Sequence, residues 1–185
     1  MDEYEETRQQ MSRLWAPWRI EYIRHSRDSE CVLCTAPARN DDESTHIIYR
    51  GVFNFIIMNA FPYSPGHLMV APFRHTADLE GITPQESAEH HALLKLGVGL
   101  LRTIAHPDGF NVGLNLGRVA GAGLDQHLHT HIVPRWLGDN NFMPVLSDTR
   151  MMSESLSSMY RRLRAALEQN PALAEAARAA GTGAG

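Results

Sequence analysis

Three histidines in strict alternation are the feature that most constrains this sequence. In the segment HLHTHIV, His127, His129 and His131 occupy every second position. Successive side chains of a β-strand point to opposite faces, so a strand here puts the three imidazoles in one row, with Cα atoms about 6.7 Å apart. Packing alone is a poor explanation for such a row, because each buried imidazole needs hydrogen-bond partners. The alternation therefore predicts a strand that carries a functional site.

The remaining pattern predicts an α+β domain. Short runs of β character are joined by turn-length connections, and a helix is expected to begin at Thr83, because Pro84 and Glu86 complete a capping-box pattern. The predicted strands span 46–51, 52–59, 67–73, 110–117 and 127–136, and the predicted helices span 83–106 and 152–169. Connections this short favour an antiparallel five-stranded sheet with helices on one face.

The length of 185 residues, 43% of them hydrophobic, indicates one domain with additions at its ends. We expect a lead-in at 1–25, a central domain at 26–150 and a C-terminal helix at 151–170. The segment 171–185 is rich in Ala and Gly and is expected to be a flexible tail.

Charge and hydropathy exclude several classes of function. A net charge of −4 argues against a nucleic-acid-binding protein with a broad basic face, since such binding relies on many phosphate contacts. No stretch reaches the roughly 20 apolar residues that a membrane span requires. The first residues are acidic and polar, unlike a secretory signal, so we expect a cytoplasmic protein.

Two chemistries are compatible with the histidine row. Alternate imidazoles suit a metal centre, and a neutral imidazole also suits nucleophilic attack on phosphorus. The preceding segment AGAG at 120–123 favours the second, because glycine lets backbone N–H groups approach an anion closely. The same loop would also serve as a plain connection between strands.

Cys31 and Cys34 form the other candidate site, a CxxC pair. Tetrahedral zinc needs four ligands, and since there is no second CxxC, histidines or carboxylates must complete such a site. A redox pair and incidental cysteines are the alternatives. The redox interpretation is disfavoured because the residues after the pair, TAPARNDD, do not resemble a helix capped by a reactive cysteine.

These motifs together resemble the histidine triad family, nucleotide hydrolases and transferases that share a fold with galactose-1-phosphate uridylyltransferase. The resemblance covers roughly residues 13–150. It includes HLHTHIV and, in order along the chain, RLWAPWRIEYI, CVLC, FIIMNAFPYSPGHLMVAPFRH, GFNVGLNLG and VPRWLGDNNFMPV. The arrangement is most similar to the bacterial branch that includes diadenosine tetraphosphate phosphorylases.

The resemblance implies a two-step displacement on a nucleotide or dinucleoside polyphosphate, with water or inorganic phosphate as acceptor. His129 would be the nucleophile and His131 would contact the scissile phosphate. Asn115 and Asn59 would hold phosphate oxygens and ribose, respectively. The loop of Gly121, Ala122 and Gly123 departs from the family pattern, which often places Ser, Thr or Gln here, so its phosphate contacts would come from backbone amides.

The resemblance also implies a zinc knuckle at 31–34, with zinc as a structural cofactor. Its ligands would be Cys31, Cys34, His75 and His127. It further implies a homodimer in which two sheets join edge to edge, which would protect an unpaired edge strand.

Other positions are less informative. His67 fits site lining and ordinary packing equally, and His90 and His91 are expected on the surface of the long helix. Trp136 would stack on a base or fill a subunit boundary. Two alternative functions remain: a nucleotide-binding module without turnover, and a metal-dependent hydrolase that uses the histidine row.

Overall fold

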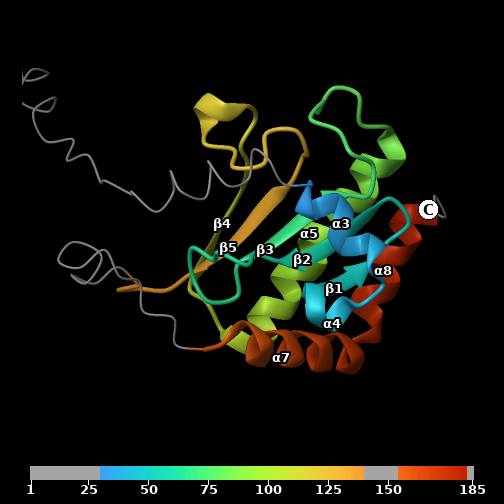
Figure 1. Cartoon of the computed structure of the whole chain (residues 1–185). Helices are drawn as coiled ribbons and strands as arrows, with labels where there is room; N and C mark the ends of the chain where they lie inside the picture. The colour runs from blue at the N-terminus through green and yellow to red at the C-terminus, as the bar shows by residue number, and fades with distance from the viewer. Residues whose placement is uncertain (1–29, 140–153, 183–185) are drawn as a thin grey trace, which may run out of the picture.

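A computed structural model describes residues 30–139 and 154–182 of the chain. They form a five-stranded sheet in the order β1-β2-β3-β5-β4, with every neighbouring pair antiparallel (Figure 1). The strands are β1 (Ile47–Arg50), β2 (Asn54–Met58), β3 (Leu68–Pro72), β4 (Gly109–Leu114) and β5 (Thr130–Arg135). The predicted α+β architecture with an antiparallel sheet is confirmed. The expected lead-in at 1–25 and the last part of the expected central domain, 140–150, lie outside the described residues.

The strand that carries the histidines begins later than predicted. Its ladder starts at Thr130 rather than at 127, with Thr130 opposite Val70 of β3 and Leu114 of β4. The backbone N–H of Leu128 instead donates to the carbonyl of Thr76, 2.7 Å away. The backbone at Leu128 is therefore bonded to the loop after β3, before the ladder of β5 begins.

The long helix α5 (Pro84–Ala105) begins as the sequence predicts. The hydroxyl of Thr83 accepts from the N–H of Glu86, and the Glu86 carboxylate accepts from the N–H of Thr83, which completes the capping box. Together with α7 (Leu156–Gln169) and α8 (Pro171–Thr182), α5 covers one face of the sheet (Figure 1). Buried side chains of this face include Ile56, Val70, Leu93, Leu100, Ile132 and Leu163.

A smaller core lies on the other face, so helices are not confined to one side. The helix α3 (Val32–Ala38) buries Leu33 and Ala36 against Phe55 and Ile57 of β2. A further short helix, α4 (Asp42–Thr45), links α3 to β1. Since both faces of β2 are covered, all five of its residues are buried, and the apolar residues at 55–58 form an unbroken run instead of alternating.

Helix α8 contradicts the expectation of a flexible tail over residues 171–182. The segment is rich in alanine, the best helix former, and begins with Pro171 at a position that tolerates proline. Leu173 packs beside Gly99 of α5, and Ala177 is buried in the main core. Burial of one face stabilises a helix that would fray in isolation. No described helix is both long and apolar enough to span a bilayer.

Candidate active site and metal centre

Four predicted ligands converge into one cluster. Their ligand atoms lie within 4.8 Å of one another, although Cys31 and Cys34 precede His75 and His127 by 41 residues or more. The Nδ1 atoms of the two histidines are 3.2 Å apart, and each cysteine Sγ lies 3.3 Å from one of them. Tetrahedral Zn²⁺ with ordinary bond lengths requires about 3.3 Å between nitrogens and about 3.6 Å between nitrogen and sulfur. The residues therefore fit a metal ion of this size.

The surroundings of His127 favour the same interpretation. Its Nε2 lies 2.8 Å from the carbonyl oxygen of Pro72, which can only accept, so Nε2 carries the hydrogen and Nδ1 presents a lone pair to the cluster. A backbone carbonyl that orients a ligating imidazole in this way is typical of metal sites.

The cysteines have properties that disfavour a reactive redox pair. Burial and the neighbouring Cys31 thiol raise the pKa of Cys34 to about 11. A reactive cysteine requires the opposite shift. One argument from sequence was wrong, however, because the pair lies at the start of helix α3, which continues to Ala38 and has Cys31 at its N-cap.

His129 lies immediately before β5 and is buried, with 6% of its surface exposed. Its Nδ1 donates to the backbone carbonyl of His127, 2.8 Å away. This hydrogen bond leaves the lone pair on Nε2, the atom that a nucleophilic imidazole uses. Burial lowers the pKa of His129, while the hydrogen bond to the carbonyl opposes the shift.

His131 is paired with His67, whose role the sequence left undecided. His67 is 1% exposed, and its Nδ1 accepts from the backbone N–H of Tyr63 at 3.1 Å. Its Nε2 must then carry the hydrogen and donate to Nδ1 of His131, 3.0 Å away. In this arrangement His131 accepts at Nδ1 and carries its hydrogen on Nε2, the ring atom that can act as a donor.

Burial, followed by electrostatic interaction with His131 and His129, lowers the pKa of His67 to about 3. This ring is therefore neutral at ordinary pH. The rings of His129 and His131 lie edge to face, with centroids 4.8 Å apart. A candidate nucleophile and a candidate donor thus lie side by side.

The predicted substrate-contacting residues come from several different segments of the fold. The amide of Asn59 lies 3.4 Å from Nδ1 of His67. Gly113 is opposite His131 in the ladder, and Asn115 follows directly after Leu114, the last paired residue of β4. The loop at 121–123 follows a short 3₁₀ helix, Arg118–Ala120, and turns at Gly121 with φ of +89°.

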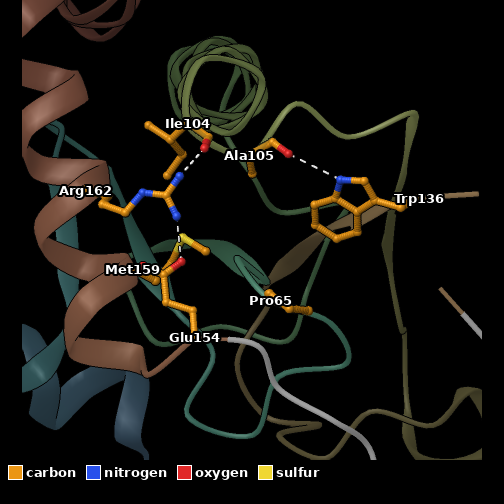
Figure 2. A pocket seen from close by; sticks show the side chains of 7 residues that line it. All are labelled: Pro65, Ile104, Ala105, Trp136, Glu154, Met159 and Arg162. Carbon is orange, nitrogen blue, oxygen red and sulfur yellow. Dashed lines mark hydrogen bonds and ion pairs between the residues drawn. The ribbon is translucent and has the colours of Figure 1, made fainter.

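Trp136 lies at the far end of β5, where it lines a cavity of about 310 Å³ between the ends of α5 and α7 (Figure 2). Its indole N–H donates to the carbonyl of Ala105. Arg162, also at this cavity, pairs with Glu154. The predicted base-stacking role of Trp136 has no support from these contacts, which involve none of the triad histidines.

Sequence reasoning missed a polar cluster at the start of α5. His90 was expected on the surface, and His91 is indeed exposed, but His90 bonds to Asn54 and Thr130 beneath the sheet. Glu89 is completely buried. The helical spacing could have indicated this cluster. Glu86, Glu89 and His90 lie on the same face of α5 as its buried leucines, nearer to the N-terminus of the helix.

Comparisons with known proteins agree with this geometry. The HIT domain family matches residues 40–136. An "AP-4-A phosphorylase" of Mycobacterium tuberculosis is 37% identical over 173 residues, which cover 89% of this chain and 88% of that protein. A "Bis(5'-adenosyl)-triphosphatase" of Saccharomyces cerevisiae is 32% identical over 95 residues, 51% of this chain and 46% of that protein.

Solved structures give the same relationship. A Zn-bound histidine triad family protein from Mycobacterium smegmatis has a TM-score of 0.62 at 28% identity, covering 77% of this chain and 96% of that one. A uridylyltransferase structure has a TM-score of 0.61 at 17% identity, covering 83% of this chain and 50% of that one, and so shares the fold. From the family match, the relatives and the arrangement of its histidines, the chain belongs to the HIT domain family.

Proposed function

We propose that this protein cleaves diadenosine polyphosphates through a nucleotidyl-histidine intermediate on His129. The observation that carries the proposal is the orientation of the ring, because Nδ1 is committed to the His127 carbonyl and Nε2 keeps the lone pair beside His131. The substrate class is supported by relatives named for AP-4-A and bis(5'-adenosyl) triphosphate, one of which covers most of the chain.

In the first step, Nε2 of His129 attacks the α-phosphorus. A phosphorus–nitrogen bond forms while the bond to the bridging oxygen breaks, and Nε2–H of His131 donates to the departing polyphosphate. In the second step, water or inorganic phosphate attacks the same phosphorus and releases the histidine. Dividing one substitution into two is the rationale of covalent catalysis, and the hydrogen bonds fix both rings beforehand. Asn59, Asn115 and the backbone of 121–123 would hold the substrate.

The test is product analysis of diadenosine tetraphosphate cleavage with the parent protein and a His129→Ala variant. We expect the variant to lose activity by a factor on the order of 10³ or more. His91→Ala is the matched control, since His91 is an exposed histidine of α5. Substantial activity in His129→Ala would contradict the proposed role, and no turnover by the parent would favour a binding module.

The same assay identifies the acceptor. ADP and ATP formed only in the presence of inorganic phosphate indicate phosphorolysis, because the phosphate becomes the second phosphate of ADP. AMP and ATP indicate hydrolysis.

The metal proposed for the cluster is zinc in a structural role. The support is the two-sulfur, two-nitrogen ligand set and its spacing. Four protein ligands leave no coordination position for substrate. Metal analysis of the purified protein should give about one equivalent of zinc per chain. The alternative of a catalytic ion shared by the whole histidine row has less support, because the metal cluster of the described residues contains His127 but neither His129 nor His131.

A homodimer with a continuous sheet is the proposed assembly. β4 is an edge strand of the described sheet, and Val112 and Leu114 on it are 48% and 38% exposed. An edge strand offers backbone N–H and C=O groups that can pair with a second strand. Sedimentation equilibrium should give twice the mass of one chain, and a monomeric mass at micromolar concentration would contradict the assembly.

A further inference from the structure

We propose that His90 is a positioning residue for the nucleophile: it holds the hydroxyl of Thr130 and thereby fixes the backbone from which His129 extends. The inference rests on the proposed role of His129. It concerns the face of the sheet opposite the catalytic histidines.

Thr130 is a polar residue in an apolar environment. It is 2% exposed, and Ile132, the next residue on the same face of β5, belongs to the main core under α5. Its hydroxyl lies 2.7 Å from Nε2 of His90. A buried hydroxyl needs such a partner, so this contact ties β5 to α5 at one defined point.

The direction of each hydrogen bond follows from the neighbours. The amide nitrogen of Asn54 donates to the carbonyl of Glu86 and to the carboxylate of Glu89, so its oxygen must accept from Nδ1 of His90, 3.0 Å away. Burial, followed by the electrostatic effect of His91, lowers the pKa of His90 to about 4 although Glu89 opposes the shift, and the ring is left neutral. Nε2 therefore accepts, and the Thr130 hydroxyl donates to it.

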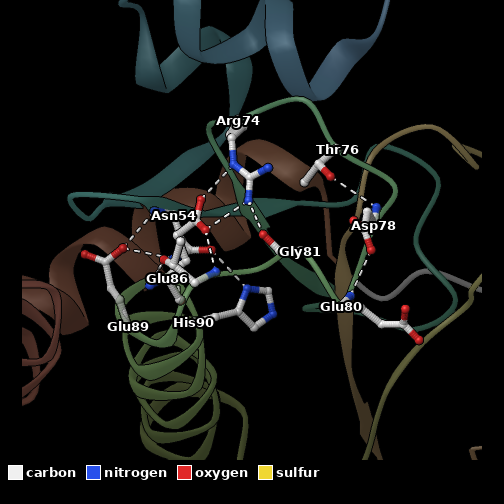
Figure 3. A network of polar contacts seen from close by, with 10 residues as sticks. Asn54, Arg74, Thr76, Asp78, Glu80, Gly81, Glu86, Glu89 and His90 are labelled. Atoms are coloured by element: carbon white, nitrogen blue, oxygen red, sulfur yellow. Dashed lines mark hydrogen bonds and ion pairs between the residues drawn. The ribbon is translucent and has the colours of Figure 1, made fainter.

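The position of His90 is fixed by Asn54, whose side-chain amide is in turn hydrogen-bonded to Glu89 (Figure 3). The Glu89 carboxylate accepts from the backbone N–H groups of Val52, Phe53 and Asn54 at 2.5–2.7 Å. The connection between β1 and β2, the first turns of α5 and the start of β5 are thus joined through Asn54 and His90. These hydrogen bonds fix the position of the Thr130 backbone, in addition to burying polar groups.

The location of the anchored residue makes it important for the reaction. Thr130 is the first residue of the β5 ladder, and His129, which precedes it, is outside the ladder. His131 follows directly on the other side. The position of both catalytic rings therefore depends on where the backbone of Thr130 is held, and small displacements of a reacting group reduce rates strongly.

Two substitutions at Thr130 test the inference, with kcat and KM measured per folded molecule. Thr130→Val keeps the shape but removes the donor, and we expect kcat to fall about tenfold or more while KM changes less than about twofold. Thr130→Ser keeps the hydroxyl and should restore most of kcat. A merely structural role would lower stability in Thr130→Val and leave kcat unchanged, which would overturn the proposal.

A second pair of variants separates the two contacts of His90. In His90→Asn the amide can replace Nδ1 and bond to Asn54, but cannot reach Thr130. In His90→Gln the amide can reach Thr130, while Asn54 loses its partner. Both variants lose one buried hydrogen bond, yet only His90→Asn should lower kcat. The double variant with His90→Asn and Thr130→Val should have nearly the same kcat as either single variant, because both remove the same contact. Equal kcat values for the two variants, or full additivity, would contradict the proposal even if Thr130→Val does not fold.

The control is His91→Gln, which should keep parental kcat. Trapping of the nucleotidyl-enzyme in the parent and its loss in His129→Ala distinguish failure of this inference from failure of the proposed function. If the intermediate depends on His129 but kcat is insensitive to Thr130 and His90, only the positioning role is wrong. If no intermediate forms in the parent, the proposed function fails together with the inference.

Discussion

Replacing Glu89 with glutamine should destabilise the protein strongly without changing its shape. The carboxylate is 0% exposed and has four hydrogen-bond donors around it. Oε1 accepts from Val52 at 2.5 Å, and Oε2 accepts from the backbone and side chain of Asn54 and from Phe53. A glutamine side chain has one oxygen that can accept, but its NH₂ group would point at an N–H donor and could not accept from it.

The expected loss follows from these contacts. One charged hydrogen bond, worth about 1.5–3 kcal/mol, is replaced by two opposed donors, and the remaining bonds become neutral and weaker. Because such terms are not additive, we expect a loss of about 2–4 kcal/mol in the free energy of unfolding. This loss is a large fraction of the free energy of unfolding of a typical domain, which is about 5–15 kcal/mol.

Urea denaturation of Glu89→Gln measures this loss directly, and the slope with urea should stay the same because the shape does. At about 2–4 °C per kcal/mol for a chain of this size, Tm should fall by about 5–15 °C. Glu168→Gln, which changes an exposed carboxylate on α7, is the control and should stay within about 0.5 kcal/mol of the parent. A similarly small effect of Glu89→Gln would refute the reasoning that a carboxylate is needed to accept these donors.

Three further predictions follow from other parts of the fold. Cys34→Ser should release the bound metal and lower Tm together with activity, as measured by metal analysis and calorimetry; unchanged metal content would exclude the cluster as the binding site. Thr83→Ala removes the N-cap of α5 and should lower the free energy of unfolding by about 0.5–2 kcal/mol in urea denaturation. Thr83→Ser keeps the capping hydroxyl and should keep most of that stability. Because the pKa of His90 is about 4 in the folded protein and about 6.5 in an unfolded chain, the unfolded state binds the extra proton, and stability should fall as pH drops from about 6.5 to 4. In His90→Gln, the loss of unfolding free energy between pH 6.5 and pH 4, measured by urea titration, should be smaller than in the parent by about 2–3 kcal/mol. The same pH dependence in variant and parent would contradict the burial of a neutral ring.

Local sequence determined several elements of this protein. The capping box at Thr83 and Glu86 fixes the start of α5, because it depends only on residues within one turn. The alternation at 127–131 predicted neighbouring imidazoles, and His129 and His131 do lie side by side. Resemblance to a family further supplied the four metal ligands, which the fold brings together.

The tertiary structure decided which partners each residue meets. From spacing alone the histidine row fitted a metal centre and a nucleophile equally, and the fold divides it, with His127 beside the cysteines and His131 beside His67. His90 and Thr130, which are 40 residues apart, meet only because α5 crosses β5. Helix α8 likewise forms where composition predicted a tail, because α5 offers it a surface. Periodicity specifies the face that a side chain occupies, whereas its hydrogen-bond partner depends on packing between distant segments, which no local pattern encodes.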